Sequence, residues 1–256
     1  ATSIDTNTGT GIGELWSGAE GFLYTPPKGF LPMCSNNSPV GVSNPSQYFK
    51  SVLYTGNNST NNISCGFQPD MVWLKSRPSA FSHSVYDTVR GRRKVNPGDS
   101  FWYWKPDSNA SPYQYGASEH IDGFYGDGFT VFGSSGMTNY TGHSFLGMAW
   151  KAGGGNIAGS SGDEFWKDGK QYASAALADV GSGSVSPTAC SVGTTPGLSI
   201  LQFTGTGANM TIAHGLNKAP EMMWVKADGD TAVYHTDMDP TTPEDYFQNI
   251  NETMAK

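Results

Sequence analysis

Charged side chains are scarce in this sequence: they make up 14% of its 256 residues, and the formal net charge is −7. An acidic chain with few Lys and Arg residues has no general attraction to nucleic acid or anionic membranes, so we predict neither as a partner. No run of 18 apolar residues occurs, and we therefore predict no membrane insertion. The chain begins Ala-Thr-Ser-Ile, with neither Met nor a basic and apolar signal, so we expect a piece of a longer protein.

Cysteine is rare as well, and Cys34, Cys65 and Cys190 lie far apart with no Cys-x-x-Cys pair. An odd number of cysteines without metal-ligand spacing indicates neither a disulfide framework nor a zinc site, so we expect buried free thiols. The five His residues show no metal-ligand spacing. Asp122 and Asp127 could offer oxygen ligands to Ca²⁺, but formation of a Gly-rich turn explains them more simply. We predict no metal and no cofactor.

Helix signals are also weak almost everywhere. Short runs of β-branched and aromatic residues alternate with Gly, Asn, Asp and Pro, which is typical of many short antiparallel strands. The clearest strands are predicted at 51–56, 70–76, 82–88, 127–135 and 144–153, with tight turning at 122–129. This pattern predicts an all-β fold, an antiparallel β-sandwich of the jelly-roll type. The end of the chain is the exception, because Thr242 before Pro243 and Glu244 predicts a helix start.

Two distant segments of the chain are alike. Tyr54-Thr55-Gly56 matches Phe203-Thr204-Gly205, Trp73-x-Lys75 matches Trp224-x-Lys226, and Val85-Tyr86 matches Val233-Tyr234, in the same order. Three blocks in one order indicate an internal repeat whose second copy is incomplete. Because half a sandwich leaves open sheet edges, we expect the rest of the copy to come from further chain or from another subunit. The predicted organisation is 46–155 for the first sandwich, 156–196 for a Gly/Ser-rich connector and 197–256 for the truncated second copy.

Several motifs follow one another in and around the first copy. They are Tyr-Thr-Gly (54–56), Gly-Phe-Gln-Pro-Asp (66–70), Val-Trp-x-Lys (72–75), His-x-x-x-Asp-x-Val-Arg-Gly (83–91), Asp-Gly-Phe (127–129) and Ala-Trp-Lys-Ala-Gly-Gly (149–154). As a set they resemble a domain that recurs in structural and tail-associated proteins of marine bacteriophages, cyanophages especially. Upstream, the segment 22–34 resembles the closing strand of a SPRY or concanavalin-like lectin domain, so residues 1–45 are predicted to be the remnant of one. The segment 95–120 departs from the family pattern, where a shorter polar loop is expected.

The resemblance implies a concanavalin-like sandwich and a modular virion protein, a tail or head fibre, on the surface of the extracellular particle. Its implied partners are other virion proteins, further copies of itself and host surface polysaccharide. The family brings no catalytic motif. A polysaccharide depolymerase would need paired carboxylates across the sugar, and the acidic pairs at 163–164 and 244–245 are adjacent in sequence. We therefore predict a non-enzymatic protein, with a depolymerase tailspike or a non-viral bacterial surface adhesin as alternatives.

Two further patterns with possible chemistry are weak. The segment 142–147 misses the Gly-x-Ser-x-Gly nucleophile motif by one residue, and Ser144 is expected to begin a strand. The basic run 90–94 is expected to be a solvated turn, because the rest of the chain is acidic.

The aromatic loop at 101–115 holds the best candidate for a binding site. In an extended chain Trp102 and Trp104 share one face, and Tyr113 and Tyr115 recur with the same spacing after a polar turn. Exposed aromatic platforms can stack on sugar rings or anchor a protein partner. The alternative interpretation is that these rings pack against a neighbouring domain or subunit.

Overall fold

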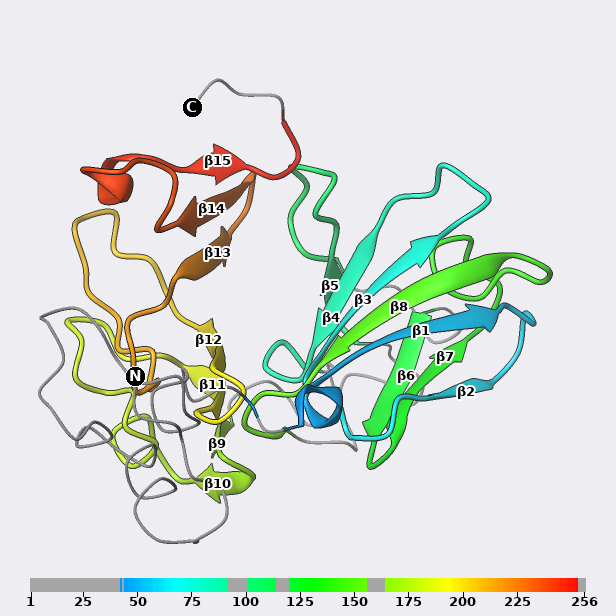
Figure 1. Cartoon of the computed structure of the whole chain (residues 1–256), viewed down its shortest axis with the longest axis horizontal. Coiled ribbons are helices and arrows are strands. Elements are labelled where there is room, and N and C mark those ends of the chain that lie inside the picture. Colours follow the sequence, from blue (N-terminus) through cyan, green and yellow to red (C-terminus); the bar gives the residue numbers. More distant parts are fainter. Residues whose placement is uncertain (1–41, 43, 92–100, 114–119, 156–163, 253–256) are drawn as a thin grey trace, which may run out of the picture. The chain divides into compact units, whose positions relative to one another are not determined.

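The structure, a computed structural model, describes residues 42, 44–91, 101–113, 120–155 and 164–252 (Figure 1). The predicted SPRY-like remnant at 1–45 lies almost wholly outside these residues. Tyr115 of the aromatic loop also lies outside them. Within them, no helix is long and apolar enough to cross a membrane. The only helical elements described are two single turns, η1 (Pro45–Gln47) and η2 (Pro243–Asp245).

The first repeat contains two antiparallel sheets that face each other, as the predicted sandwich requires. The five-stranded sheet has the order β1-β8-β3-β4-β5, and the three-stranded sheet has the order β2-β7-β6. All predicted strands of this repeat are confirmed. The strands are β1 (Phe49–Thr55), β2 (Asn61–Ser64), β3 (Met71–Ser76), β4 (Ser84–Asp87), β5 (Tyr103–Trp104), β6 (His120–Tyr125), β7 (Gly128–Phe132) and β8 (Ser144–Trp150).

Strand β3 shows how the sequence directs the packing of this sandwich. Val72 and Leu74 are fully buried against the second sheet, while Met71, Trp73 and Lys75 lie half-buried on the outer face. This two-residue alternation is the one that the sequence predicts. The core contains side chains from both sheets: Ile63, Cys65, Phe67, Val72, Leu74, Tyr86, Phe101, Tyr103, Ile121, Phe124, Phe129, Val131 and Ala149.

The Gly-rich segment 122–129 is mostly strand rather than turn. Strands β6 and β7 form a hairpin in which Tyr125 pairs with Gly128, so only Gly126 and Asp127 make the turn. Ser64 donates a hydrogen bond to the Asp127 carboxylate, and the Asp127 carbonyl accepts from the amides that follow β2. Asp127 thereby ties the hairpin to the neighbouring strand.

The segment 156–196, predicted to be a connector, contains strands in its described part, which begins at residue 164. Strands β9 (Phe165–Lys167), β10 (Lys170–Tyr172) and β11 (Ala189–Gly193) join β12 (Leu198–Gln202) in a sheet of order β10-β9-β11-β12. Short strands form in this Gly- and Ser-rich sequence because they pack around a small hydrophobic core of their own. Its buried members are Ala175, Ala178, Val180, Cys190 and Val192.

The second repeat repeats the register of the first. Trp224 of β13 (Met222–Lys226) pairs with Val233 of β14 (Thr231–His235), as Trp73 pairs with Val85 between β3 and β4. The internal repeat predicted from the sequence therefore has a structural counterpart. The helix predicted from Thr242 is wrong: η2 is one turn, and its end leads into β15 (Gln248–Asn249), which pairs with β14. The Thr242 side chain makes no cap hydrogen bond, and pairing with β14 satisfies the backbone instead.

Candidate functional site

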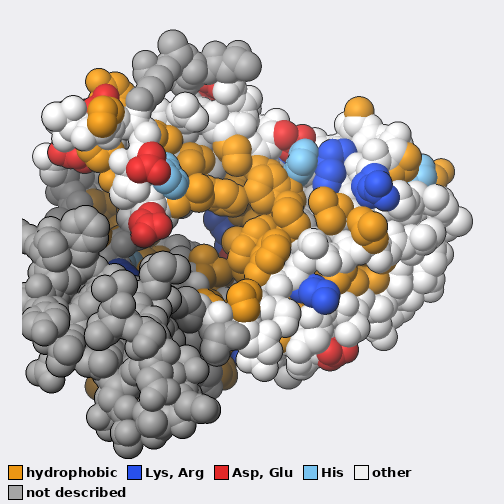
Figure 2. Space-filling view, in the orientation of Figure 1, with side chains coloured by type: hydrophobic (Ala, Val, Ile, Leu, Met, Phe, Trp, Pro, Cys, Tyr) orange, Lys and Arg blue, Asp and Glu red, His pale blue; other side chains and the backbone are white. Residues whose placement is uncertain are grey.

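Three tryptophans from the two repeats meet at one place, which we call the tryptophan cluster: Trp73 of β3, Trp104 of β5 and Trp224 of β13. The Trp224 ring lies edge-on to both others, with centroids 5.6 Å from Trp73 and 6.3 Å from Trp104. Edge-to-face pairs at this distance contribute stabilisation beyond the burial of their area. Hydrophobic side chains gather in the middle of this face, over β13 and β14 and over β3, β4 and β5 (Figure 2).

The Trp73 indole is held by hydrogen bonding as well as by packing. Its Nε1 donates to Nδ1 of His83 over 2.8 Å, and the two rings are T-shaped with centroids 5.6 Å apart. This bond requires His83 to be neutral, with Nδ1 as the acceptor. Burial lowers the pKa of His83, which favours that form. His83 thus has a hydrogen-bonding and packing role beside Trp73.

Trp104 is only 3% exposed, so it has little free surface to offer a sugar ring. Besides Trp224 it meets the Arg90 guanidinium, whose central carbon lies 5.8 Å from the ring centroid. Arg90 is also ion-paired with the buried Asp87 carboxylate. The first residue of the predicted solvated basic turn is thus fixed between a carboxylate and an indole. For Trp104 this burial agrees with the alternative interpretation, packing against a neighbouring domain.

The remaining residues of the aromatic loop lie in different settings. Tyr113 stacks on the buried Tyr103, with centroids 5.8 Å apart, and the Lys105 ammonium lies 4.9 Å from the Tyr113 centroid. Trp102 is half-buried, and its amide donates to Gly91. Of the four predicted binding residues, Trp102 and Tyr113 are therefore partly exposed, and Tyr115 lies outside the described residues.

The buried Asp70 carboxylate binds the chain that follows the last strand of the first repeat. Asp70, 1% exposed, accepts hydrogen bonds from the amides of Ala152 and Gly154 at 2.7 and 3.1 Å, directly after β8. Its other oxygen lies 3.5 Å from the Thr88 hydroxyl. Burial raises the pKa of Asp70 to about 6, although the two amides and the Lys151 ammonium favour the charged form. The Gly-Phe-Gln-Pro-Asp and Lys-Ala-Gly-Gly motifs are therefore hydrogen-bonded to each other through the Asp70 carboxylate.

The chain after β8 also packs tightly against β11, in what we call the glycine junction: Ala152–Gly155 with Val192 and Gly193. A Cβ added at Gly153 would overlap the Val192 backbone, and one added at Gly193 would overlap the Ala152 carbonyl. The Ser191 hydroxyl accepts from the Gly153 amide at 3.0 Å and donates to the Gly154 carbonyl at 2.6 Å. Glycine is needed here because two backbones approach without room for side chains.

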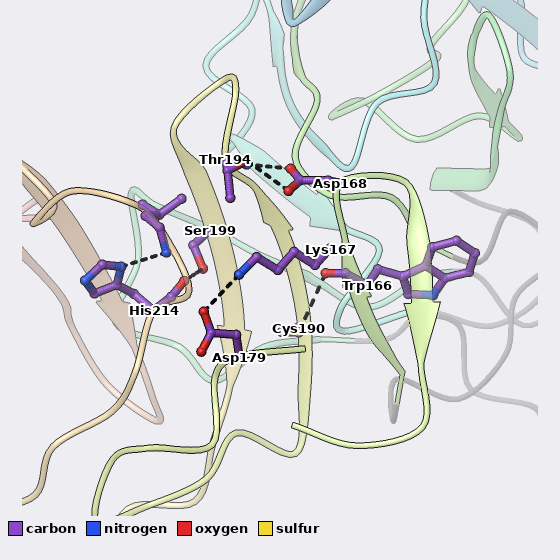
Figure 3. Close-up of polar contacts among 9 residues, drawn as sticks. Trp166, Lys167, Asp168, Asp179, Cys190, Thr194, Ser199 and His214 are labelled. Carbon is purple, nitrogen blue, oxygen red and sulfur yellow. Dashed lines mark hydrogen bonds and ion pairs between the residues drawn. The ribbon is translucent and has the colours of Figure 1, made fainter. Parts of the chain in front are cut away.

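A two-residue hairpin turn adds a second contact to this junction. Asp168 and Gly169, between β9 and β10, both have positive φ (51° and 80°), which matches the Asp-Gly preference of tight hairpins. The Gly169 amide donates to Gly153, and the Asp168 carboxylate accepts from the amide and hydroxyl of Thr194. Figure 3 shows this carboxylate facing Thr194, with the Lys167–Asp179 ion pair nearby.

The pocket beside the junction suits water rather than a substrate. It is lined by Thr88, Val89, Gly154, Gly155, Glu164, Trp166 and Cys190, and its volume of about 10 Å³ matches one water molecule. Burial raises the pKa of the Cys190 thiol, so the reactive thiolate is disfavoured. Among the described residues, no group of three or more His, Cys, Asp or Glu side chains could hold a metal ion.

Comparison with known families identifies the repeated unit. The family described as "Domain of unknown function (DUF7483)" matches residues 44–165 and again residues 164–256. The chain belongs to this family. Its second match begins at 164, so it includes the strands β9 to β11 that the sequence alone had suggested were a connector. No curated protein and no solved structure matches the chain.

Sequence reasoning missed the residues that hold the repeats together. Gly153 lies in a motif, but no local pattern predicts its contact with Val192 of the next repeat. Asp70 also lies in a motif, and its hydrogen bonds reach Ala152 and Gly154, 82 and 84 positions later in the sequence. Nothing in the sequence distinguishes Ser191 from the other serines of its Ser-rich segment, so its contacts with Gly153 and Gly154 could not be predicted. The Asp168-Gly169 pair was visible, because Asp-Gly between two short apolar-rich runs is a strong hairpin signal.

Proposed function

We propose that the chain is a non-enzymatic structural module of a bacteriophage virion, a tail or head fibre in which copies of one β-sandwich follow one another. The observation that carries the proposal is the glycine junction together with the tryptophan cluster. Both place motif residues of one repeat against the next unit. The phage identity is supported by the resemblance of the motif set in residues 54–154.

Rigid coupling is what a display protein needs. A fibre transmits and positions contacts over distance, and a series of modules gains avidity when several engage one surface. Backbone-tight packing and edge-to-face rings, at the contacts that the structure describes between the repeats, resist bending there.

Host-surface contact is the second part of the proposal, and we assign it to the partly exposed residues Trp102 and Tyr113. Aromatic faces of this kind can stack on sugars. Trp104 is assigned to the inter-repeat contact because it is buried against Trp224.

Immunogold electron microscopy of the source particles tests the proposal, with antibody raised against residues 44–155. Gold at tail tips or on protruding fibres is the expected result. Gold spread over capsid faces would indicate a decoration protein and overturn the fibre assignment. Label on bacterial surfaces with none on particles would overturn the virion assignment in favour of an adhesin.

Host contact needs a separate measurement, adsorption of particles that carry Trp102→Ala. Reduced adsorption is expected, while Phe247→Ala, at an exposed aromatic of the second repeat, should leave adsorption unchanged. Equal adsorption by wild type and Trp102→Ala would remove the ring from the host contact.

A further inference from the structure

Several loops of the first repeat lie together at one end of its sandwich. Thr55 at the end of β1 pairs with Ser144, and Ser76 at the end of β3 pairs with the next residue of β8. The loops that leave or enter the sheets beside these pairs are 56–60, 77–83 and 133–143 (Figure 1). Loops carried by a rigid sandwich are common places for binding, because their side chains are not needed for strand pairing.

These loops carry a group of aromatic rings, which we call the ring platform: Phe81, Tyr140 and His143. Phe81 and Tyr140 are 42% and 46% exposed. The His143 imidazole is close to both, with its centroid 4.9 Å from that of Tyr140 and 6.1 Å from that of Phe81. It also neighbours the buried Phe145, at 6.4 Å. Rings from two loops therefore form one surface that rests on the core of the sandwich.

The ring platform is held in place by packing and by hydrogen bonds. A Cβ added at Gly136 would overlap the Phe81 ring, so this ring packs directly on the backbone of the neighbouring loop. Asn139 is fully buried, and its side-chain amide donates to the carbonyls of Ser59 and Gly133 at 2.6 and 3.0 Å. Asn139 thereby joins two of the loops. A site that is fixed before binding loses little conformational entropy when a ligand arrives.

The second repeat forms the equivalent of the β3–β4 hairpin with a shorter loop. Nine residues separate the paired Leu74 and Ser84, whereas six separate the equivalent pair, Val225 and Ala232. The shorter loop reads Ala-Asp-Gly-Asp at 227–230 and contains no aromatic residue. The hairpin therefore does not need an aromatic ring in order to close. The longer loop of the first repeat is an addition to the repeat, and its exposed ring is available for another role.

The composition of the three loops fits a neutral sugar chain. Apart from the rings they consist mostly of Gly, Ser, Thr and Asn, and Arg77 is the one residue in them with a fixed charge. The C–H face of a pyranose is apolar and packs on the electron-rich face of an aromatic ring, while its hydroxyls bond to amide, hydroxyl and imidazole groups. A stable protein interface would need a larger apolar centre than two partly exposed rings provide.

We propose that the ring platform is a binding site for a neutral polysaccharide. Phe81 and Tyr140 stack on its sugar rings, and the His143 imidazole hydrogen-bonds to their hydroxyls. The site consists of other residues than Trp102 and Tyr113, to which we assign host contact. It belongs to the first repeat alone, and it requires neither a virion nor the second repeat.

Affinity electrophoresis tests the site on the whole chain. The protein migrates through native gels that contain a soluble β-glucan, galactan or mannan, and calorimetry with the polysaccharide that retards it gives the dissociation constant. We expect retardation by at least one of the three. Phe81→Ala and Tyr140→Ala should each weaken binding about threefold to tenfold, which is the effect of losing one stacked ring.

A loop exchange within the chain provides a stricter variant. Residues 76–82 are replaced by Ala-Asp-Gly-Asp, the loop at 227–230, so that Lys75 and His83 are kept. This chain should keep the urea midpoint of the wild type and lose binding; if it does not fold, the two point variants decide. Leu53→Ala is the matched control, because Leu53 is an apolar residue of the same repeat, 65% exposed and outside the loops. It should bind like the wild type.

Four results would overturn the proposal. A wild type that none of the three polysaccharides retards would show that the ring platform binds no neutral sugar chain. Equal losses from Leu53→Ala and Phe81→Ala would show unspecific adhesion. Loss of binding in Trp102→Ala but not in Phe81→Ala would assign the sugar contact to the aromatic loop. Capture of a bacterial envelope protein that Phe81→Ala abolishes, without retardation by any polysaccharide, would identify a protein as the partner instead.

Discussion

Trp73 and Trp224 occupy the same position in the two repeats, and their rings touch each other, with centroids 5.6 Å apart and planes at 77°. The motif that makes the repeats recognisable in the sequence is thus also the motif that joins them. In each copy the adjoining Lys, Lys75 or Lys226, donates to a carbonyl of the following loop, Ser79 or Gly229. The Trp-x-Lys spacing therefore serves two structural purposes: contact between copies and closure of a turn.

The glycine junction gives the first prediction. Gly153→Ala should lower the free energy of unfolding by about 1–3 kcal/mol, because the new Cβ overlaps the Val192 backbone and one of the two must move. Urea denaturation measures the change. Gly126→Ala is the matched control, since a Cβ there meets nothing within 4 Å and φ lies outside the left-handed region. Equal destabilisation by the two variants would contradict the tight packing.

Asp70 gives a prediction about pH. Its folded pKa, about 6, lies above the ordinary value of 3.8, so the folded state holds the proton more tightly than the unfolded state. Its contribution to stability is therefore present below pH 4 and is lost as pH rises to about 6, by about 3 kcal/mol at most. Asp70→Asn can keep the amide and Thr88 contacts and should remove this pH dependence. Urea midpoints from pH 4 to 7 measure it.

The control for Asp70 is Asp228→Asn, at an exposed carboxylate of the second repeat. This variant should follow the wild-type profile at each pH. A wild type and Asp70→Asn that differ by the same amount from pH 4 to 7 would show that Asp70 does not titrate in this range.

His120 should have the opposite pH dependence. The ring is buried, its Nδ1 lies 2.7 Å from the Tyr86 hydroxyl, and burial lowers its pKa to about 4. A lowered pKa means that stability is present above about pH 6.5 and is lost as pH falls toward 4. His120→Asn tolerates the positive φ of 96° and keeps an acceptor for Tyr86. The urea midpoint of His120→Asn should fall less on acidification than the midpoint of the wild type. A parallel loss in both proteins would contradict the low pKa.

The aromatic loop gives a prediction that separates its two tryptophans. Trp104→Ala should lower the free energy of unfolding by about 3 kcal/mol or more, because the ring is 3% exposed and contacts Trp224 and Arg90. Trp102→Ala, at a half-buried ring, should cost clearly less. Thermal unfolding of both variants measures the difference. The reverse order would mean that Trp102 and not Trp104 is the packed ring.

The sequence allowed the sandwich and the repeat to be predicted because both depend on local alternation and on motif order. The burial of Val72 and Leu74, and the exposure of the opposite face of β3, follow from the alternation alone. The bond between Asp70 and the chain after β8 could not be foreseen, because it depends on which strands are neighbours. The chain after Thr242 pairs with β14 through β15 in place of the predicted helix. Strands β9 to β11 were missed because the small core that stabilises them lies in a Gly/Ser-rich segment.

The candidate site was predictable only in part, and for a physical reason. Alternation in an extended chain places Trp102 and Trp104 on one face, but β5 is two residues long, so the alternation does not continue. Burial of Trp104 depends on Trp224, which lies 120 positions later in the sequence. No pattern within the loop carries that information.

A double-mutant cycle on Trp73 and Trp224 tests most directly whether the two repeats are coupled through their shared motif. Urea unfolding is measured for the wild type, Trp73→Ala, Trp224→Ala and the double variant. We expect a coupling free energy of about 0.5–1.5 kcal/mol, because each single variant already removes the contact. Strictly additive losses would contradict a stabilising contact and, with it, the rigid series of repeats on which the proposed fibre function rests.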